Sequence, residues 1–112
     1  MKKIVITVWY TCKPGMRDKV MELAKKNVEE TRKEPGNLVY AHYPSMENDQ
    51  DMFVIEVWDS YEAVEKHIYM PHYLEFSLAR KPLLVEGTYR YVTYQAEEFT
   101  TGDGIPSWSD KQ

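Results

Sequence analysis

Two segments of this chain are apolar on both faces of the strand that each would form. In residues 3–12, the run from Ile4 to Tyr10 places branched or aromatic side chains at odd and even positions alike. Residues 52–58 repeat the pattern, and Glu56 is the one charged position within them. Side chains of a strand alternate between the two faces of a sheet, so strands of this kind need cover on both sides. The fold must therefore place a layer on each face of its sheet.

The composition suits one folded domain. A chain of 112 residues is long enough for a core of its own but leaves no room for a second one. Hydrophobic residues make up 43% and charged residues 29%, a balance typical of globular rather than disordered proteins. Nine Tyr, three Trp and three Phe are many for this length. They favour a packed core or interface, with a ligand-stacking pocket as the less frequent alternative.

Charge and cysteine content exclude several classes of partner. The formal net charge is −4 and the basic residues are dispersed, so we expect no nucleic-acid partner. Cys12 is the single cysteine, which rules out an internal disulfide and fits a reducing compartment. The first residues do not form a signal peptide, and no apolar stretch approaches membrane-spanning length. We therefore expect a cytoplasmic protein with no membrane partner.

Hydrophobic periodicity and turn residues define the order of elements. Apolar positions from Met16 follow a helical stripe that Pro35 and Gly36 end, and Asp59 is the expected cap of a second helix. In chain order we expect strand 3–12, a helix from 16 to 34, strand 38–43, strand 52–58, a helix that Pro71 divides, and strand 88–94. The order β-α-β-β-α-β predicts an α+β, ferredoxin-like split βαβ fold with a four-stranded antiparallel sheet.

This fold places both helices on one face of the sheet and leaves the other face open. Because the strands at 3–12 and 52–58 are apolar on both faces, the open face also requires burial. The simplest cover is the same face of a second copy, related by a two-fold axis. We therefore expect a homodimer that forms a dimeric α/β barrel.

The candidate chemistry lies between Phe53 and Phe76. His67 falls on the apolar stripe of its helix, where a core histidine with satisfied nitrogens is the more frequent situation and a neutral base facing a cavity is the functional one. His72 follows Pro71 at the start of the next helical piece, where the helix dipole disfavours protonation. In a continuous helix the two rings would point about 140° apart. Only the break at Pro71 lets them converge.

Glu56 is the other unusual residue of this stretch. A carboxylate in an apolar strand must either pair with a cation or shift its pKa, so Glu56 is an orienting group, a base, or one half of a salt bridge to a neighbouring strand. The aromatic residues around it serve as packing residues or as pocket walls.

Other kinds of site have little support in the sequence. His42, His67 and His72 come from separate segments without a short metal-ligand spacing, so we expect no metal. No phosphate-binding or dinucleotide-binding glycine motif is present, so we expect no nucleotide or flavin cofactor. The expected domain covers residues 1–95. Residues 96–112 form a tail whose Phe99, Ile105 and Trp108 would dock on the chain's own surface or on a partner copy.

Two stretches together resemble a known family. They are KPGMRDKVMELAKKNVEETRKEPGNLVY, residues 13–40, and FVIEVWDSYEAVEKHIYMPHYLEF, residues 53–76. With the last strand, the resemblance covers about residues 3–95, and it is to the antibiotic biosynthesis monooxygenase (ABM) domains of the dimeric α/β-barrel superfamily. Haem-degrading members of that superfamily carry an Asn, a Trp and a His where this chain has Thr7 or Val8, His67 and Ser77. The resemblance therefore does not extend to haem breakdown.

The resemblance implies oxygenation of a phenolic or quinol-type small molecule by dioxygen, without metal or flavin, in a pocket between sheet and helices. It implies His67 and His72 as base or orienting groups. The substrate-binding residues expected around them are Glu56, Trp58, Tyr73 and Phe76. Isomerisation of a small carbonyl compound would use the same histidine base. A non-catalytic ligand-binding or dimerisation module is the alternative from another class.

Overall fold

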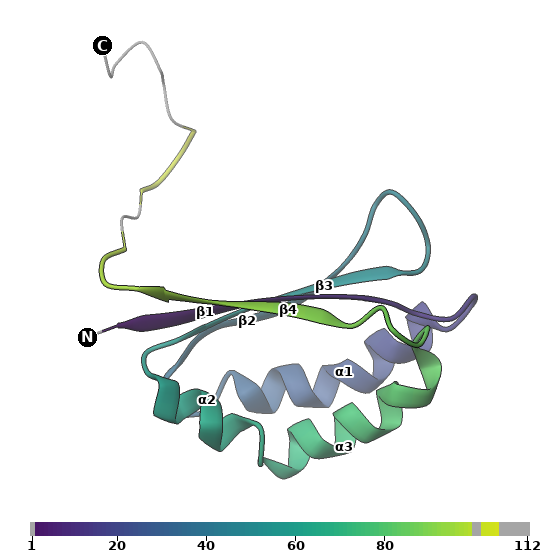
Figure 1. Cartoon of the computed structure of the whole chain (residues 1–112), viewed down its shortest axis with the longest axis horizontal. Helices are drawn as coiled ribbons and strands as arrows, with labels where there is room; N and C mark the ends of the chain where they lie inside the picture. The colour runs from purple at the N-terminus through teal and green to yellow at the C-terminus, as the bar shows by residue number, and fades with distance from the viewer. Residues whose placement is uncertain (1, 100–101, 106–112) are drawn as a thin grey trace.

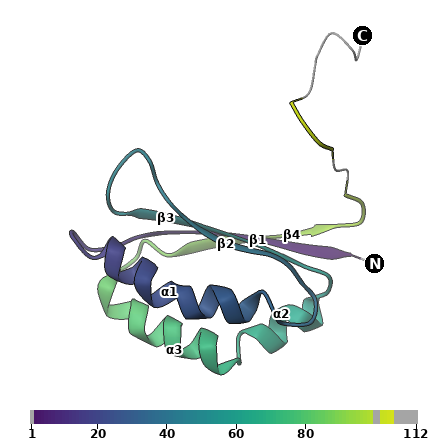
Figure 2. The same cartoon turned by 180° about the vertical axis from the view of Figure 1, so that it is seen from behind.

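The structure is a computed structural model, and it describes residues 2–99 and 102–105. Its elements are β1 (Lys3–Thr11), α1 (Arg17–Thr31), β2 (Asn37–Pro44), β3 (Asp51–Trp58), α2 (Tyr61–His67), α3 (Pro71–Arg80), the 3-10 turn η1 (Lys81–Leu83) and β4 (Arg90–Ala96). The strands form one antiparallel sheet in the order β2-β3-β1-β4. This confirms the predicted α+β, ferredoxin-like fold. All three α-helices lie on one face of the sheet (Figures 1 and 2).

The strand register assigns each residue to one face of the sheet. Glu56 on β3 is opposite Ile6 on β1 and Tyr40 on β2, and Trp58 is opposite Ile4. These side chains all point toward the helices, because Ile4, Tyr40 and Trp58 form a buried cluster with Ala63 of α2. A second buried cluster follows the same face toward the other end of the sheet. It contains Val8, Tyr10, Cys12, Val20, Ala24, Met52, Val54 and Phe76.

Helix α1 is attached to the sheet by apolar packing and by a short polar chain. Its buried residues Val20, Ala24, Asn27 and Thr31 recur every three or four positions, as the sequence pattern predicted. The amide Nδ2 of Asn27 donates to Tyr40 Oη at 2.9 Å, and Thr31 Oγ1 donates to Asn27 Oδ1 at 3.2 Å. Because these buried polar atoms satisfy one another, α1 has a defined position along β2.

Two details differ from the sequence prediction. The cap of α2 is Ser60, whose Oγ accepts a hydrogen bond from the backbone N–H of Ala63 at 3.2 Å. Asp59, the expected cap, is one residue too early. It contacts the α1–β2 turn instead, where its backbone N–H donates to the carbonyl oxygen of Gly36. The last strand begins at Arg90 rather than at residue 88. Thr88 lies in the preceding turn, where its hydroxyl oxygen accepts from the N–H of Thr11.

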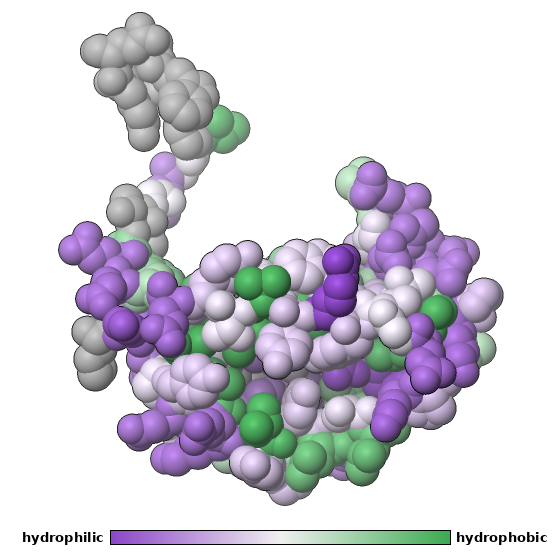
Figure 3. Space-filling view, in the orientation of Figure 1, coloured by the Kyte–Doolittle hydropathy of each residue, from purple (hydrophilic) through white to green (hydrophobic). Residues whose placement is uncertain are grey.

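The face of the sheet away from the helices is exposed and largely apolar. Its side chains include Trp9, Val39, Tyr43, Val92 and Tyr94, and each of these is more than a third exposed. No element within residues 2–99 and 102–105 covers it. The β2–β3 loop rises from the sheet on this open side (Figure 1), and it is mainly hydrophilic in Figure 3. The outer face therefore has the composition of a surface that needs a cover.

Two further expectations concern the ends and the surface of the chain. In the tail, Lys3 Nζ lies 5.2 Å from the centre of the Phe99 ring, while Ile105 is almost fully exposed. Trp108, the third residue expected to dock, lies outside the described residues. Among the described helices, none has the length and apolar character that crossing a membrane requires.

Candidate active site

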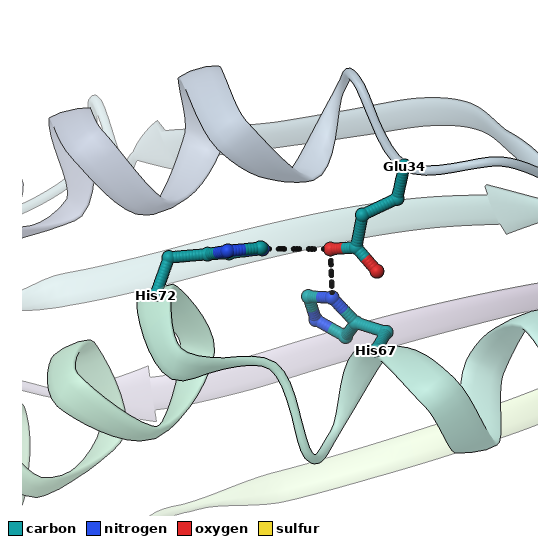
Figure 4. A group of neighbouring side chains, drawn as sticks. All are labelled: Glu34, His67 and His72. Carbon is teal, nitrogen blue, oxygen red and sulfur yellow. Dashed lines mark hydrogen bonds and ion pairs between the residues drawn. The ribbon is translucent and has the colours of Figure 1, made fainter.

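The break at Pro71 brings both histidines to one carboxylate. His67 is the last residue of α2, and Pro71 begins α3 after a short turn, so His72 approaches from a new direction. His67 Nδ1 and His72 Nε2 each lie 2.8 Å from the same oxygen of Glu34, Oε2 (Figure 4). An ionised carboxylate only accepts hydrogen bonds, so each ring donates an N–H to it. The predicted convergence of the two rings is confirmed, and its centre is Glu34.

Glu34 is positioned by the turn that follows α1. Gly36 has φ +88°, a left-handed conformation that favours glycine. A Cβ at this position would lie 2.7 Å from both the Cβ of Ala63 and Oδ1 of Asp59. The turn therefore packs directly against the start of α2, which holds Glu34 beside the far end of the same helix.

His67 is a neutral ring at neutral pH. Its side chain is 1% exposed, and burial lowers its pKa, although the bond to Glu34 opposes that shift. Because Nδ1–H is committed to Glu34, the other nitrogen, Nε2, carries a free lone pair. Nε2 is buried, and it has no hydrogen-bond partner among the described residues. The ring is therefore neutral, with its proton on Nδ1, and Nε2 is the nitrogen that could accept a proton from a ligand. This is the state that a general base requires.

A cavity of ≈ 290 Å³ lies beside His67, between the helices and the sheet. Its lining residues are Ile6, Val8, Glu56, Tyr61, Val64, His67, Ile68, Tyr73, Tyr89, Tyr91 and Thr93. Hollows of ≈ 740 and ≈ 680 Å³ also exist, but they are more open grooves along α1 and beside Pro82. The smaller cavity has two buried titratable side chains in its wall, His67 and Glu56, so we treat it as the candidate active site.

Glu56 remains in this cavity without a cation partner. Its Oε1 accepts a hydrogen bond from Trp58 Nε1 at 2.9 Å, and no ion pair of the described residues includes it. Burial raises the pKa of Glu56 to about 7, although the Trp58 bond and the nearby Arg80 charge act in the opposite direction. Of the alternatives considered from the sequence, the pKa shift is therefore the one that the structure has, rather than the salt bridge.

The other expected site residues divide into two groups. Tyr73 lines the cavity, and its ring centre lies 4.7 Å from that of His67. Trp58 and Phe76 do not line it, because Trp58 is fully buried beneath α2 and Phe76 belongs to the core cluster under α1 and α3. His72 is also outside the wall and contacts Glu34 from the solvent side. The expected aromatic wall is instead made of tyrosines, and Tyr61, Tyr89 and Tyr91 were not singled out from the sequence.

Glu34 is the functional residue that sequence reasoning missed. It was considered only as the end of a helix before Pro35. One sequence feature does point to Glu34. An acidic residue close to a helix C-terminus interacts unfavourably with the helix dipole, so a separate favourable interaction is expected to compensate for it. Here that interaction is with the pair of imidazole N–H groups.

The three side chains are also of the types that bind divalent transition metals. One ligand atom from each of Glu34, His67 and His72 lies within 4.8 Å of the others. The metal set considered from the sequence contained His42, but both of its nitrogens are buried away from Glu34 and have no partner in the part of the chain that the structure describes. In this structure the same atoms form hydrogen bonds with one another, since His67 Nδ1 and His72 Nε2 both bind Glu34 Oε2. These bonds hold the His67 ring in place.

Comparisons with known proteins agree with this architecture. Residues 3–79 match the family described as "Antibiotic biosynthesis monooxygenase". An uncharacterized protein of Synechocystis is 29% identical over 73 residues, which are 65% of this chain and 50% of that protein. This chain thus spans about half the length of that curated relative.

Solved structures show the same fold. A conserved protein from Methanosarcina mazei has a TM-score of 0.77 at 26% identity, over 84% of this chain and 92% of its own. A candidate antibiotic biosynthesis monooxygenase from Nitrosomonas europaea has a TM-score of 0.81 at 20% identity, over 88% and 94%. SnoaB, a cofactor-independent oxygenase from Streptomyces nogalater, has a TM-score of 0.73 at 14% identity, over 87% and 95%. The match over most of the folded domain shows that this chain belongs to the antibiotic biosynthesis monooxygenase family.

Proposed function

We propose that this chain is a cofactor-independent monooxygenase that acts on a small aromatic, phenolic or quinol-type molecule in the cavity beside His67. The observation that carries the proposal is the state of that ring: Nδ1 is held by Glu34, Nε2 is buried without a partner among the described residues, and the residue lines the cavity. A buried polar atom without a partner is rare in native structures, and a ligand hydroxyl is a suitable donor for it. The family match and the likeness to SnoaB support this class of reaction.

The chemistry requires a base, a dry cavity and correct orientation. His67 takes the hydroxyl proton of the substrate, and the resulting electron-rich anion passes an electron to dioxygen. A bond then forms between a ring carbon and oxygen. Cleavage of the O–O bond leaves a carbonyl group on the ring and releases water. A hydroxyaromatic compound and dioxygen thus give a quinone and water, with the substrate as the only reductant. The tyrosines and aliphatic side chains of the wall give the anion mainly apolar surroundings, which would exclude water once a substrate fills the cavity.

Replacing His67 with alanine is expected to lower the rate of oxygen uptake by about 10²- to 10⁴-fold, because the base is lost. Uptake is measured with an oxygen electrode against a panel of hydroxynaphthalenes and hydroquinones. His42→Leu is the matched control, because this second histidine does not line the cavity and should leave the rate within about two-fold.

Other outcomes would select the alternatives. Turnover that needs no oxygen, with solvent deuterium entering a carbonyl substrate, would indicate an isomerase that uses the same base. Saturable binding without any turnover would indicate a ligand-binding module. Equal oxygen uptake by wild type and His67→Ala would contradict the assigned base.

We also propose that two copies pair through the outer face of the sheet. The apolar side chains of that face support this, because they are exposed to water in a single copy and would be buried against the same face of a second one. Trp9→Glu, which places a charge on the inner strand β1 of this face, is expected to weaken the dimer at least 100-fold. Light scattering at micromolar concentration should then give the mass of one chain. Tyr69→Glu, an equally conspicuous change on the exposed surface of the helical side, should keep the dimer mass. A single-chain mass for the wild type would refute the proposal.

A further inference from the structure

Glu56 is a second proton-carrying group in the wall of the cavity, and the base chemistry of His67 does not use it. It extends from the centre of β3 toward the helices and is 8% exposed. Only Oε1 is hydrogen-bonded, to the indole of Trp58, and Oε2 makes no hydrogen bond within the described part of the chain. Trp58 thus orients the carboxyl group and leaves one oxygen for a ligand.

The two groups approach the cavity from different layers. Glu56 comes from the sheet and His67 from the last turn of α2, and both belong to the wall of the same ≈ 290 Å³ space. Trp58 links them, because its ring centre lies 4.9 Å from that of His67 while its N–H holds Glu56. A small ligand in the cavity therefore lies beside both His67 and Glu56.

Charged and titratable groups from several neighbouring elements interact with Glu56. Arg80 of α3 favours the ionised carboxylate, whereas Glu34, after α1, disfavours it. Tyr40 of β2 and Tyr89, before β4, also interact with the Glu56 charge. Arg80 makes no ion pair within residues 2–99 and 102–105; it lies against the rings of Tyr10, Phe76 and Tyr89. Burial outweighs these contributions, so the protonated carboxyl group persists up to neutral pH.

We propose that Glu56 is the general acid of this cavity and that it works as a pair with His67 on a substrate of one or two fused rings that carries two oxygen functions. The inference rests on the proposed function for the identity of the reaction. After dioxygen has bonded to the ring carbon, the Glu56 carboxyl group donates its proton to the terminal oxygen of the peroxide. The Glu56 carboxylate then takes the proton of the ring C–H, and the electron pair of that bond forms the carbonyl as the O–O bond breaks. The departing hydroxide takes the proton held by His67 and leaves as water, so both groups return to their starting states.

The size of the cavity restricts the substrate. Pockets for drug-sized ligands have volumes of roughly 300 to 1,000 Å³, so ≈ 290 Å³ lies at the lower end of that range. One or two fused rings suit such a space. One ring oxygen would give its proton to His67, and a second oxygen would accept a hydrogen bond from the Glu56 carboxyl group. A hydroquinone of the benzene or naphthalene series has both.

The test combines anaerobic binding with turnover, so that it does not depend on oxygen chemistry alone. The probe is 1,4-dihydroxynaphthalene, with its dissociation constant measured by calorimetry from acidic to alkaline pH under argon. In the wild type we expect binding to weaken at least five-fold as the pH rises through about 7, where Glu56 ionises. Glu56→Gln should make binding independent of pH across this range. Glu65→Gln, which removes an exposed carboxylate of α2, should behave as the wild type.

Turnover and infrared spectra supply independent measurements. Glu56→Gln should lower kcat at least 30-fold while changing KM less than five-fold, because the amide keeps a hydrogen bond but cannot donate a proton. Infrared difference spectra on probe binding below pH 7 should show a perturbed carboxyl C=O stretch in the wild type that Glu56→Gln lacks. The same pH dependence of binding in Glu56→Gln and wild type would overturn the inference. If binding and infrared spectra follow the expectation but no oxygen is consumed, the proposed monooxygenase function fails while Glu56 remains the acid of the cavity.

Discussion

Glu34→Ala is expected to lower the free energy of unfolding by about 3 to 5 kcal/mol. The Glu34 side chain is 6% exposed, and its carboxylate accepts two hydrogen bonds at 2.8 Å, from His67 and His72. A hydrogen bond to a charged group contributes about 1.5 to 3 kcal/mol, and a buried donor left without its acceptor keeps the full cost of losing water. The same variant should lower any turnover by at least about 10²-fold, because the His67 proton is no longer confined to Nδ1 and the ring is no longer held in place.

Urea unfolding of wild type and variants, at one protomer concentration, measures the first effect. Glu34→Gln should cost less than Glu34→Ala, because both donors bind one oxygen, Oε2, and an amide oxygen in that place still accepts both N–H groups, although without the charge of the carboxylate. Glu30→Gln is the matched control one turn earlier, where the carboxylate pairs with Lys33 at the surface, and it should change stability by less than about 0.5 kcal/mol. A Glu34→Ala variant as stable as this control would show that the two hydrogen bonds do not hold α2 and α3 to the α1–β2 turn.

His42→Leu is expected to remove a large part of the acid sensitivity of this fold. Both ring nitrogens of His42 are buried without hydrogen-bond partners among the described residues. Burial, together with the charges of Arg80 and Arg32, lowers the pKa of His42 from 6.5 to about 3. The folded state therefore binds fewer protons than the unfolded chain below pH 6.5. Stability is lost as the pH falls from 6.5 toward 3, and this one site accounts for about 5 kcal/mol across that range.

Urea unfolding between pH 4 and pH 8 tests the effect through the difference between wild type and His42→Leu. The difference should be small above pH 7 and grow in favour of the variant as the pH falls. Leucine should fit, because the ring of His42 packs against Phe76 and Tyr40 and gives up no hydrogen bond. The raised pKa of Glu56 acts in the opposite direction, since it makes the folded state lose stability as the pH rises from about 4.5 to 7. A constant difference at all pH values would exclude His42 as the acid-sensitive group.

Much of the fold was predictable because its signals are local. Strand and helix periods, the helix end at Pro35 and Gly36, and the break at Pro71 are each contained in a few neighbouring residues. Errors occurred where two polar residues compete for one role. Asp59 and Ser60 can both cap a helix, and the contact of Asp59 with Gly36, more than 20 positions away, decided between them.

The site was predictable only in part. His67 and Glu56 could be identified as members of a pocket because each is an unusual residue in its own segment, whereas Tyr73 was expected there only from the family resemblance. Trp58 and Phe76 are equally conspicuous in the sequence, but their rings belong to the core. The sequence shows which side chains are apolar, but it does not show which of them border an empty space.

The amino-acid sequence was sufficient for the order of elements, for the apolar character of both faces of the sheet, and for the two histidines as candidate site residues. These depend on period, propensity and turn chemistry within short windows. The tertiary structure alone showed that Glu34 joins both rings and that, within residues 2–99 and 102–105, neither an ion pair of Glu56 nor a hydrogen bond of the buried His42 ring is present. Those facts depend on which side chains from distant segments meet in a place without water, and that is decided only when the whole chain packs.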